Sequence, residues 1–390
     1  MNVSKVKNCS GCMLCKAMCR LKCIEIDTDR EGFMVPVVRQ DKCVNCGVCL
    51  KKCPQYNAVP INKASKVYAL QRNDEDKLKL SSSGGLGYAL GEYVLNNGGI
   101  VYGCVFDENI KAVHVKCDSI EKLKKTCSSK YVQSDFSDVY STILDDCKNY
   151  KSVLVVGTPC QIAAIKNYVG DRYDNLILVD LICHGVPSPE LFKKYLDWKA
   201  EDMGQENIIS FNFRNKNKGW GTTYQAVAAT ATATATATAD PYYEGFLYAE
   251  NYRECCYMCK YAKGERVGDI TIGDFWGIQR FHEEFVPIMT KGVSVALINS
   301  RKGEKLFKSI AGEFKYIEST FDKAAFENSN LVRPASRPDI RDEFYIKIEQ
   351  EGFDWVNLKL YKNKRYYVNW IKNVMPKPLK RFIKRLIGRK

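Results

Sequence analysis

Residues 153–185 of the chain have the sequence VLVVGTPCQIAAIKNYVGDRYDNLILVDLICHG. The apolar, β-branched runs at 153–158 and 176–182 have the length of buried strands, and the segment between them carries apolar residues at helical spacing. A strand-helix-strand unit of this size forms a right-handed crossover, so its two strands are parallel. Cys160 and Cys183 follow these strands. We therefore expect both thiols at one carboxyl edge of a sheet, where such folds bind ligands.

The same alternation of strands and helices extends outward from this unit. Residues 66–71 and 100–106 are predicted strands, and the segment between them has apolar residues three and four positions apart, as in a helix. Farther along, predicted strands at 208–213 and 293–299 are mixed with loops. The sequence therefore predicts an α/β fold with a mixed sheet, α+β overall.

The composition excludes one class of function. The 390 residues carry a net charge of +14, but residues 355–390 hold twelve Lys and Arg and no Asp or Glu. The remaining residues hold 47 basic and 45 acidic side chains and are nearly neutral. A nearly neutral body with a cationic tail is not typical of a protein that binds a polyanion, so we expect no nucleic-acid partner.

Cysteine is the unusual residue of this chain, with 18 copies, half of them before residue 54. No charged leader with an apolar stretch opens the sequence, and no run of about 18 apolar residues occurs in it. We therefore expect a cytoplasmic protein. In a reducing cytoplasm, clustered cysteines indicate metal ligands or catalytic thiols before disulfides.

Two four-cysteine runs share the spacing C-x2-C-x2-C-x3-C. The first is Cys9, Cys12, Cys15 and Cys19, and the second is Cys43, Cys46, Cys49 and Cys53. Three thiolates on one tight loop can bind three corners of an iron-sulfur cube, while the fourth points to the partner loop. We therefore predict two 4Fe-4S clusters with exchanged fourth ligands, so that Cys53 completes the first set and Cys19 the second.

Zinc is the alternative occupant, because thiolates at C-x2-C spacing also suit a tetrahedral ion. The duplicated spacing favours iron-sulfur clusters. Arg20 stands where a proline usually follows the first run, which removes no ligand. Cys23 fits neither cluster and is predicted to be a small buried residue. Four further cysteines have no partner spacing and are assigned to packing: Cys104, Cys117, Cys127 and Cys147.

A second set of thiols lies in the later part of the chain. Cys256 and Cys259 have cluster spacing and could join Cys160 and Cys183 around a third cube. Cys160 also begins a predicted helix, whose N-terminal dipole favours a thiolate. Inert buried cysteines and a zinc pair are the alternatives. Cys255 could replace Cys256 as a ligand.

Two polar loops are candidate cofactor loops. Residues 81–87 (SSSGGLG) precede an amphipathic helix, so backbone N–H groups and hydroxyls could converge there on an anion. A flexible loop capped by serine is the alternative. Residues 129–134 (SKYVQS) carry an aromatic ring and a lysine, which suit ring stacking and phosphate pairing. The dinucleotide and P-loop fingerprints are both missing from these stretches.

Several of these runs together resemble the coenzyme F420 hydrogenase/dehydrogenase beta-subunit family, here behind a ferredoxin domain with two 4Fe-4S clusters. The resemblance covers about residues 5–310. It rests on Ser82-Ser83-Gly84-Gly85, SKYVQS at 129–134, GTPCQ at 157–161, CHGVPSP at 183–189, Cys256-x2-Cys259 and DITIGDFWG at 269–277.

Members of this family are flavoproteins with FAD beside an iron-sulfur cluster. The resemblance therefore implies FAD here, and a third 4Fe-4S cluster held by Cys160, Cys183, Cys256 and Cys259. It also implies which residues line the flavin: Ser82, Ser83, Gly84, Gly85, Lys130, Tyr131, Gln133 and Thr158. The substrates of the family vary, so the resemblance implies a small-molecule substrate without naming it.

The function expected on these grounds is a flavin-dependent iron-sulfur oxidoreductase. Electrons would pass between a ferredoxin or another redox donor protein, the three clusters, FAD and an organic substrate, because a flavin couples one-electron and two-electron chemistry. His184 is the candidate proton donor, with a core or capping histidine as the alternative. A non-catalytic subunit that relays electrons to a partner enzyme is the alternative function.

We expect four parts along the chain: a ferredoxin domain (1–56), an α/β flavin and cluster region (66–205), a region with the C-x2-C pair (206–345) and a basic tail (355–390). Residues 377–390 form a predicted basic amphipathic helix, which suits peripheral contact with the inner face of a membrane. Docking onto an acidic protein and simple solubilisation are the alternatives. No function is assigned to the Ala-Thr alternation at 228–239.

Overall fold

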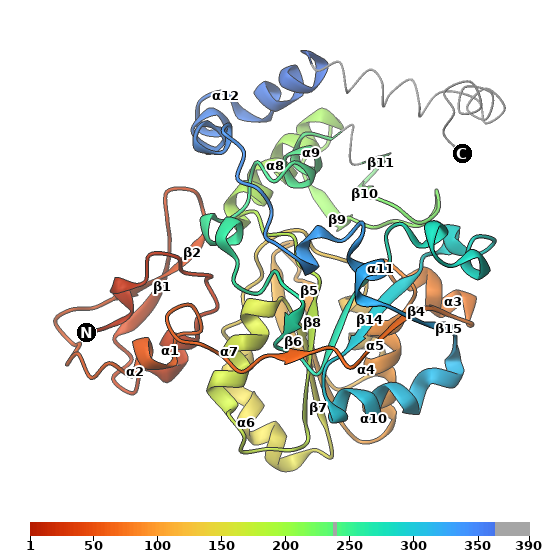
Figure 1. Cartoon of the computed structure of the whole chain (residues 1–390). Helices are drawn as coiled ribbons and strands as arrows, with labels where there is room; N and C mark the ends of the chain where they lie inside the picture. The colour runs from red at the N-terminus through yellow and green to blue at the C-terminus, as the bar shows by residue number, and fades with distance from the viewer. Residues whose placement is uncertain (237–239, 363–390) are drawn as a thin grey trace.

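The computed structural model describes residues 1–236 and 240–362 (Figure 1). Its largest element is an eight-stranded sheet with the strand order β15-β4-β14-β13-β8-β7-β5-β6. The strands of this sheet are β4 (Lys66–Arg72), β5 (Ile100–Phe106), β6 (Ala112–Cys117), β7 (Val153–Gly157), β8 (Leu176–Leu181), β13 (Ile270–Asp274), β14 (Ser294–Ile298) and β15 (Phe314–Ser319). The neighbours from β5 to β13 are parallel and the other pairs antiparallel. The predicted α/β fold with a mixed sheet is therefore confirmed.

Helices cover both faces of this sheet. The described helices are α1 (Leu14–Met18), α2 (Val48–Lys52), α3 (Glu75–Leu80), α4 (Leu86–Asn96), α5 (Ile120–Thr126), α6 (Val139–Asn149), α7 (Pro159–Val169), α8 (Pro189–Asp202), α9 (Pro241–Leu247), α10 (Arg301–Ile310), α11 (Phe321–Ala325) and α12 (Arg341–Lys362). Val153 and Val155 of β7 pack with α6 and α7, whereas Leu154 packs with α4 and α10. Because both faces of β7 are buried, its sequence is continuously apolar rather than alternating.

The β7-α7-β8 unit has the predicted parallel arrangement. Pro159 takes the first position of α7, where its fixed φ is favourable, and the side chain of Gln161 accepts the N–H of Thr158 at 3.0 Å. Cys160 therefore lies in the first turn of α7, and Cys183 lies two residues beyond the end of β8. Both residues are at the carboxyl edge of the sheet.

Residues 1–57, which we call the head, form a small unit beside the sheet (Figure 1). The hairpin of β1 (Ile24–Thr28) and β2 (Met34–Val38) separates the two cysteine runs. α1 and α2 each begin after a left-handed residue, Met13 and Gly47, that directly follows the second cysteine of a run. The chain becomes extended at Cys19 and Cys53, so the two runs have the same local fold.

An aromatic layer covers the carboxyl edge of the sheet. It combines α8, α9 and α12 with a small sheet, and its core is rich in Tyr and Phe. The strands of this sheet are β9 (Ile208–Asn212), β10 (Thr223–Ala228) and β11 (Thr232–Thr236). Part of the Ala-Thr alternation thus pairs with β10, and residues 237–239 lie outside the described residues. Two short strands, β3 (Asn62–Lys63) and β12 (Glu265–Arg266), pair near the connection to the head.

The predicted amphipathic helix at 377–390 lies outside the described residues. Within the described part of the chain, no helix combines the length and the apolar character needed to cross a membrane. The division into four parts stays a prediction.

Candidate functional site

A cavity of about 520 Å³ lies at the carboxyl edge of the sheet, next to the head. Both candidate cofactor loops and the thiols that follow β7 and β8 contribute to its lining. The sequence-predicted residues in the lining are Ser82, Ser83, Gly85, Lys130, Tyr131, Gln133, Thr158, Cys160, Cys183, His184, Cys256 and Cys259. Gly84 lies behind it, where an added Cβ would be 2.2 Å from the carbonyl oxygen of Leu70. Glycine therefore allows this loop to approach β4.

The thiols of the body, the described part from residue 62 onward, gather at one end of the cavity. Cys259 and Cys255 lie near Cys160, and Cys160 and Cys259 lie near Cys183. Cys256 lines the cavity and also packs against the aromatic core. Burial raises the pKa of Cys160 to about 12 and also raises the pKa of Cys183. Such thiols ionise together only when a metal centre replaces their protons, and soft thiolates suit iron-sulfur clusters.

In the head, Cys53 lies with the first run. Cys12 and Cys15 both have Cys9 and Cys53 as neighbouring thiols. Burial, together with the neighbouring thiols of Cys9 and Cys53, raises the pKa of Cys15 to about 12. This arrangement fits the four thiolates of one cube. Among the described residues, no three His, Cys, Asp or Glu side chains are close enough to share a single metal ion.

The second run is connected with Cys19 through Cys23. The sulfur atoms of Cys19 and Cys23 are 3.3 Å apart, and Cys23 also contacts Cys43. Cys23 is buried, as expected of a packing residue, but it lies among the thiols assigned to the second cluster. The backbone N–H of Asn45 lowers the pKa of Cys43. Cys46 is the one exposed cysteine of the described residues.

Three body side chains fix the first run against the cavity. Arg253 donates from Nε to the carbonyl of Cys9 at 2.7 Å and from Nη1 to the carbonyl of Met34 at 3.0 Å. Tyr140 donates to the carbonyl of Cys12 at 2.8 Å, and Tyr261 donates to that of Pro54 at 2.9 Å. Both phenols also lie near Cys160. Cys9 and Cys12 of the first run are therefore on the side of the head that faces the body thiols.

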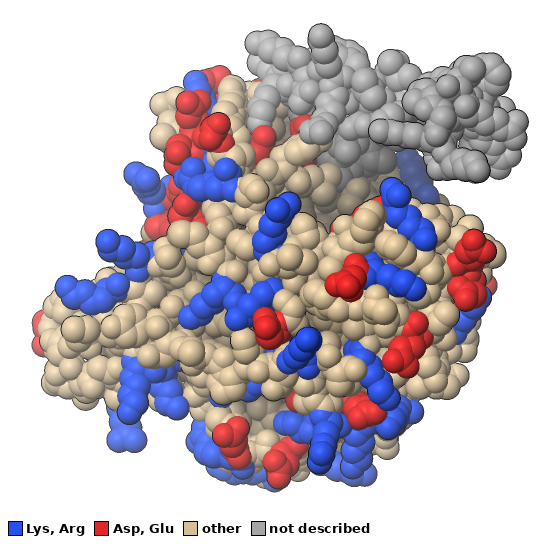
Figure 2. Space-filling view, viewed as in Figure 1, with Lys and Arg blue, Asp and Glu red and all other residues tan. Residues whose placement is uncertain are grey.

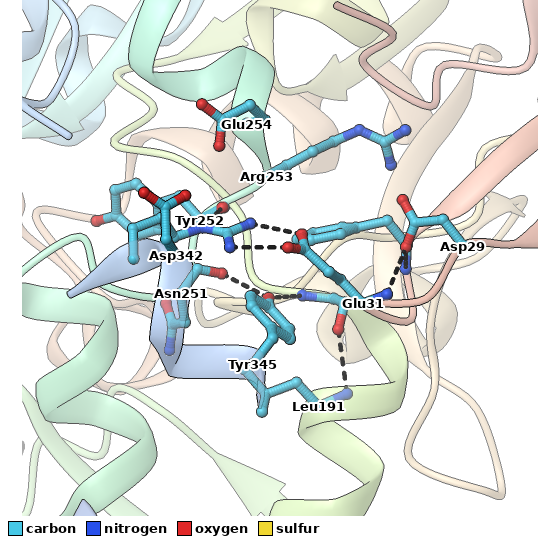
Figure 3. A network of polar contacts seen from close by, with 12 residues as sticks. Asp29, Glu31, Leu191, Asn251, Tyr252, Arg253, Glu254, Asp342 and Tyr345 are labelled. Carbon is cyan, nitrogen blue, oxygen red and sulfur yellow. Dashed lines mark hydrogen bonds and ion pairs between the residues drawn. The ribbon is translucent and has the colours of Figure 1, made fainter. Parts of the chain in front are cut away.

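A second group of contacts holds the hairpin of the head against α12 (Figure 3). Arg341 donates two hydrogen bonds to the carboxylate of Glu31, at 3.0 and 2.6 Å, and a third to the carbonyl of Tyr252 at 2.8 Å. Tyr345 donates to the carbonyl of Asn251 at 2.8 Å. Bidentate Arg-carboxylate pairs fix orientation as well as distance. The hairpin is thereby held in one orientation on the body.

Arg214 connects both candidate loops, although no motif in the sequence marks it. Its five N–H groups are all used. They donate to Ser82 O at 3.0 Å, Tyr131 Oη at 3.0 Å, Gly221 O at 2.7 Å and the two carboxylate oxygens of Asp274 at 2.8 and 3.0 Å. The side chain is almost fully buried. Arg214 therefore positions the loops rather than offering a free cation to a ligand.

Lys130 lines the cavity, so its predicted phosphate contact stays a prediction. Its ammonium group donates to the carbonyls of residues 125–128, at 3.2, 3.1, 2.8 and 3.1 Å. These carbonyls belong to the end of α5 and the turn after it, where a cation is favourable. Tyr131 stacks on Phe246 with ring centroids 4.3 Å apart. In this structure the loop presents an aromatic wall to the cavity, and its ammonium caps a helix.

Three buried polar atoms in the lining have no hydrogen-bond partner. They are Ser10 Oγ, Ser81 Oγ and Gln133 Nε2. An unpartnered buried polar group costs about 1–3 kcal/mol, so a ligand rich in polar atoms would stabilise this site. The residues present therefore fit a flavin dinucleotide, which offers both polar atoms and an aromatic ring system.

His184 lies deep in the same cavity, near Asp274 and Arg214. Burial lowers its pKa, so the imidazole is neutral near pH 7. Asp274 also accepts the indole N–H of Trp220 at 2.7 Å, and Trp220 stacks on Trp276 at 4.6 Å. His184, Asp274 and Trp276 all line the cavity.

A buried polar network supports Cys160 from behind. Thr158 Oγ1 contacts the sulfur of Cys160 at 3.2 Å and donates to Gln161 at 3.0 Å. Gln161 donates to Ser134 at 2.9 Å, and the Ser134 hydroxyl lies 3.0 Å from Nδ1 of His114. His114 Nε2 contacts the carbonyl of Val156 at 3.1 Å. A hydrogen bond to this carbonyl requires a proton on Nε2, and burial favours the neutral imidazole. The histidine that supports the site is therefore one that the sequence did not indicate.

The burial of His114 makes the free energy of unfolding depend on pH. Burial lowers the pKa of His114 from 6.5 to about 4. The unfolded chain then binds the proton first on acidification, so stability is lost as the pH falls through this window, by up to about 3 kcal/mol. The measurement is the free energy of unfolding of the wild type and of His114→Gln against pH. We expect the variant to lose less stability on acidification than the wild type. Equal losses would show that His114 does not cause the pH dependence.

Comparisons with known proteins bear on both parts of the chain. Residues 150–322 match the family model for the C terminus of the coenzyme F420 hydrogenase/dehydrogenase beta subunit, and residues 8–57 match the model described as 4Fe-4S dicluster domain. No curated protein matches the chain. A chain of the xenon-derivatized F420-reducing [NiFe] hydrogenase complex from Methanosarcina barkeri is 17% identical, with 79% of this chain and 95% of that chain covered and a TM-score of 0.46. This likeness is too weak to support an inference.

Proposed function

We propose that this chain is a flavin-dependent iron-sulfur oxidoreductase. Residues 150–322 belong to the coenzyme F420 hydrogenase/dehydrogenase beta-subunit family, and residues 8–57 belong to the 4Fe-4S dicluster domains. Iron-sulfur electron transfer is the part that the family matches establish. FAD, a third 4Fe-4S cluster and an organic substrate are our additions. The observation that supports these three additions is that one cavity is lined both by the body thiols and by the two candidate loops.

The position of the head supports an order of electron transfer. The set of Cys9, Cys12, Cys15 and Cys53 faces the body, and Cys9 lies near Cys255. We assign this set to the relay between the second head cluster and the body thiols. Arg253, Tyr140 and Tyr261 would hold it there, because they donate hydrogen bonds to the backbone carbonyls of Cys9, Cys12 and Pro54.

The body thiols of Cys160, Cys183 and Cys259 would hold the third cluster, with Cys256 or Cys255 as the fourth ligand. The family resemblance favours Cys256, whereas the neighbourhood of Cys160 favours Cys255. The Thr158 and Gln161 side chains would keep Cys160 oriented toward the cluster through the network that ends at His114.

FAD would occupy the cavity beside these thiols. When bound, it supplies the conversion between single electrons and electron pairs that clusters alone lack. Ser82, Ser83 and Gly85 would contact its polar groups and Tyr131 would provide an aromatic wall, while Gln133 would donate its unpartnered N–H. His184, neutral near pH 7, would accept or return a proton at the substrate.

A relay subunit without a substrate of its own is the second candidate. The description of the matched family as a beta subunit favours it, since a subunit acts with other chains. Substrate-dependent oxidation of the reduced protein in the absence of any partner would separate the two functions in favour of the enzyme.

The cofactor content of the anaerobically purified chain tests this proposal. Three clusters and one flavin predict about twelve iron, about twelve sulfide and one FAD per chain. Iron and sulfide are measured chemically, flavin by its absorbance after extraction, and zinc in the same sample. A count of about eight iron atoms per chain would contradict the third cluster. A sample without flavin, or with zinc in place of iron, would contradict the proposed function.

A further inference from the structure

The two ends of the head differ in exposure. Cys12, Cys15 and Cys53 of the first set are buried, in part by the contacts that Arg253, Tyr140 and Tyr261 make with this side. In the second run, Cys46 is exposed and Cys43 is partly exposed, whereas Cys49 is buried. An external protein can therefore approach the second cluster site more closely than any other cysteine set of the described chain.

The loop of residues 43–48 forms an open apolar surface around Cys46. Val44 is 70% exposed and Val48 39% exposed, which is unusual for valine in a loop without a partner. Asn2 donates to Asn45 at 3.1 Å and holds the N-terminal segment against the loop. Gly47, with φ +76°, has only the carbonyl of Met1 within 4 Å of where a Cβ would be. The loop is thus fixed at its base and open on its outer side.

Basic side chains surround this loop. Residues 1–8 and 39–53 contain one acidic residue, Asp41, against six basic ones: Lys5, Lys7, Arg39, Lys42, Lys51 and Lys52. All six are exposed; Arg39 forms ion pairs with Glu25 and Asp41, and Lys52 donates to the carbonyl of Asn167 on α7. On the face drawn in Figure 2, Lys and Arg side chains project from the head with few acidic ones between them. A 4Fe-4S cluster with four thiolates contributes about −2, which leaves the surface positive.

We propose that this surface, the 43–48 loop with its basic surroundings, is the docking face for an acidic one-electron carrier protein. The inference rests on the proposed function and names its partner. Opposite charges would steer and orient the encounter, while the small apolar centre would bring the two redox centres together in a transient interface. One electron passes from the reduced centre of the carrier, which is oxidised, to the second head cluster, which is reduced. No bond forms and no proton moves.

A protein partner fits these observations better than an anionic membrane. The apolar part is small and centred on a ligand of the second cluster, so its occupant has to bring an electron to that point. A lipid surface would bind the basic side chains around the 43–48 loop but would make no use of a redox centre near the exposed Cys46. Binding to anionic vesicles is therefore a competing outcome of the experiment.

The experiment measures binding of the anaerobic holoprotein to an immobilised, strongly acidic plant-type 2Fe-2S ferredoxin. The variants are Val44→Glu and Lys42→Glu, and the control is Lys305→Glu, an exposed lysine on α10 of the body. We expect the first two variants to weaken binding at least tenfold and the control to leave it within twofold. Raising the ionic strength from about 0.05 M to about 0.5 M should also weaken the wild-type complex, since salt screens exposed charges.

Equal binding by all four proteins would overturn the proposal, as would a wild type that binds anionic phosphatidylserine vesicles but not the ferredoxin. Iron and flavin content of each variant is measured beside the binding. A variant with full cofactors and weak binding supports the docking face alone. Absence of iron in the wild type would instead overturn the proposed function, so the two failures are distinct.

Discussion

Cys160→Ser should stop the reduction of the flavin through the clusters and leave the two head clusters intact. Serine is a poor ligand for iron, so the variant should lose the body cluster and fall from about twelve to about eight iron per chain. Flavin reduction by a donor that enters at the head should drop to the rate of the direct chemical reaction. The measurement is anaerobic stopped-flow absorbance of the flavin, with iron analysis of the same sample.

Cys147→Ser is the matched control, because Cys147 is a buried cysteine of α6 assigned to packing. It should keep all of its iron and the wild-type rate. Normal flavin reduction in Cys160→Ser would refute the body cluster. Serine at Cys255 and at Cys256 in separate variants then identifies the fourth ligand, since only the true ligand should reproduce the loss of iron.

Arg214→Met should have the second large effect, on both stability and flavin retention. It removes the side chain that joins Ser82, Tyr131 and Asp274, and it leaves the mostly buried carboxylate of Asp274 without its cation. Breaking such a pair from one side costs about 3–5 kcal/mol. We expect that loss in the free energy of unfolding and a flavin affinity at least tenfold weaker, measured by denaturant titration and by equilibrium dialysis.

The double variant Arg214→Met/Asp274→Leu separates the two effects. Removing both charges should recover most of the stability, because no unpaired buried charge remains. It should not recover flavin binding, because neither candidate loop regains its anchor. Full recovery of flavin binding in the double variant would show that Arg214 acts only through the charge of Asp274, contrary to its role in positioning the loops.

Local patterns predicted the central fold because they are short-range. The apolar runs that became β7 and β8 and the turn at Pro159 required no knowledge of distant residues. The two cysteine runs likewise carry their geometry in their spacing. This is why the sheet edge with Cys160 and Cys183, and the similar folds of both runs, could be predicted from the sequence.

The contacts that arrange these parts could not be predicted in the same way. Arg253 binds Cys9 across 244 positions and Arg341 binds Glu31 across 310 positions, and no periodicity marks single arginines. Lys130 shows the opposite problem. Its type suggested an anion, but its ammonium group donates to carbonyl groups at the end of the preceding helix. Which partner a long cationic side chain takes depends on the packed structure.

The central claim is that the thiols of the head and the body hold iron-sulfur clusters that communicate with a flavin in the cavity. Low-temperature electron paramagnetic resonance of the fully reduced, anaerobic protein tests it most directly. The account predicts signals of magnetically interacting 4Fe-4S clusters that integrate to about three spins per chain. A spectrum that integrates to two spins without any interaction between body and head, or one without iron-sulfur signals, would contradict it.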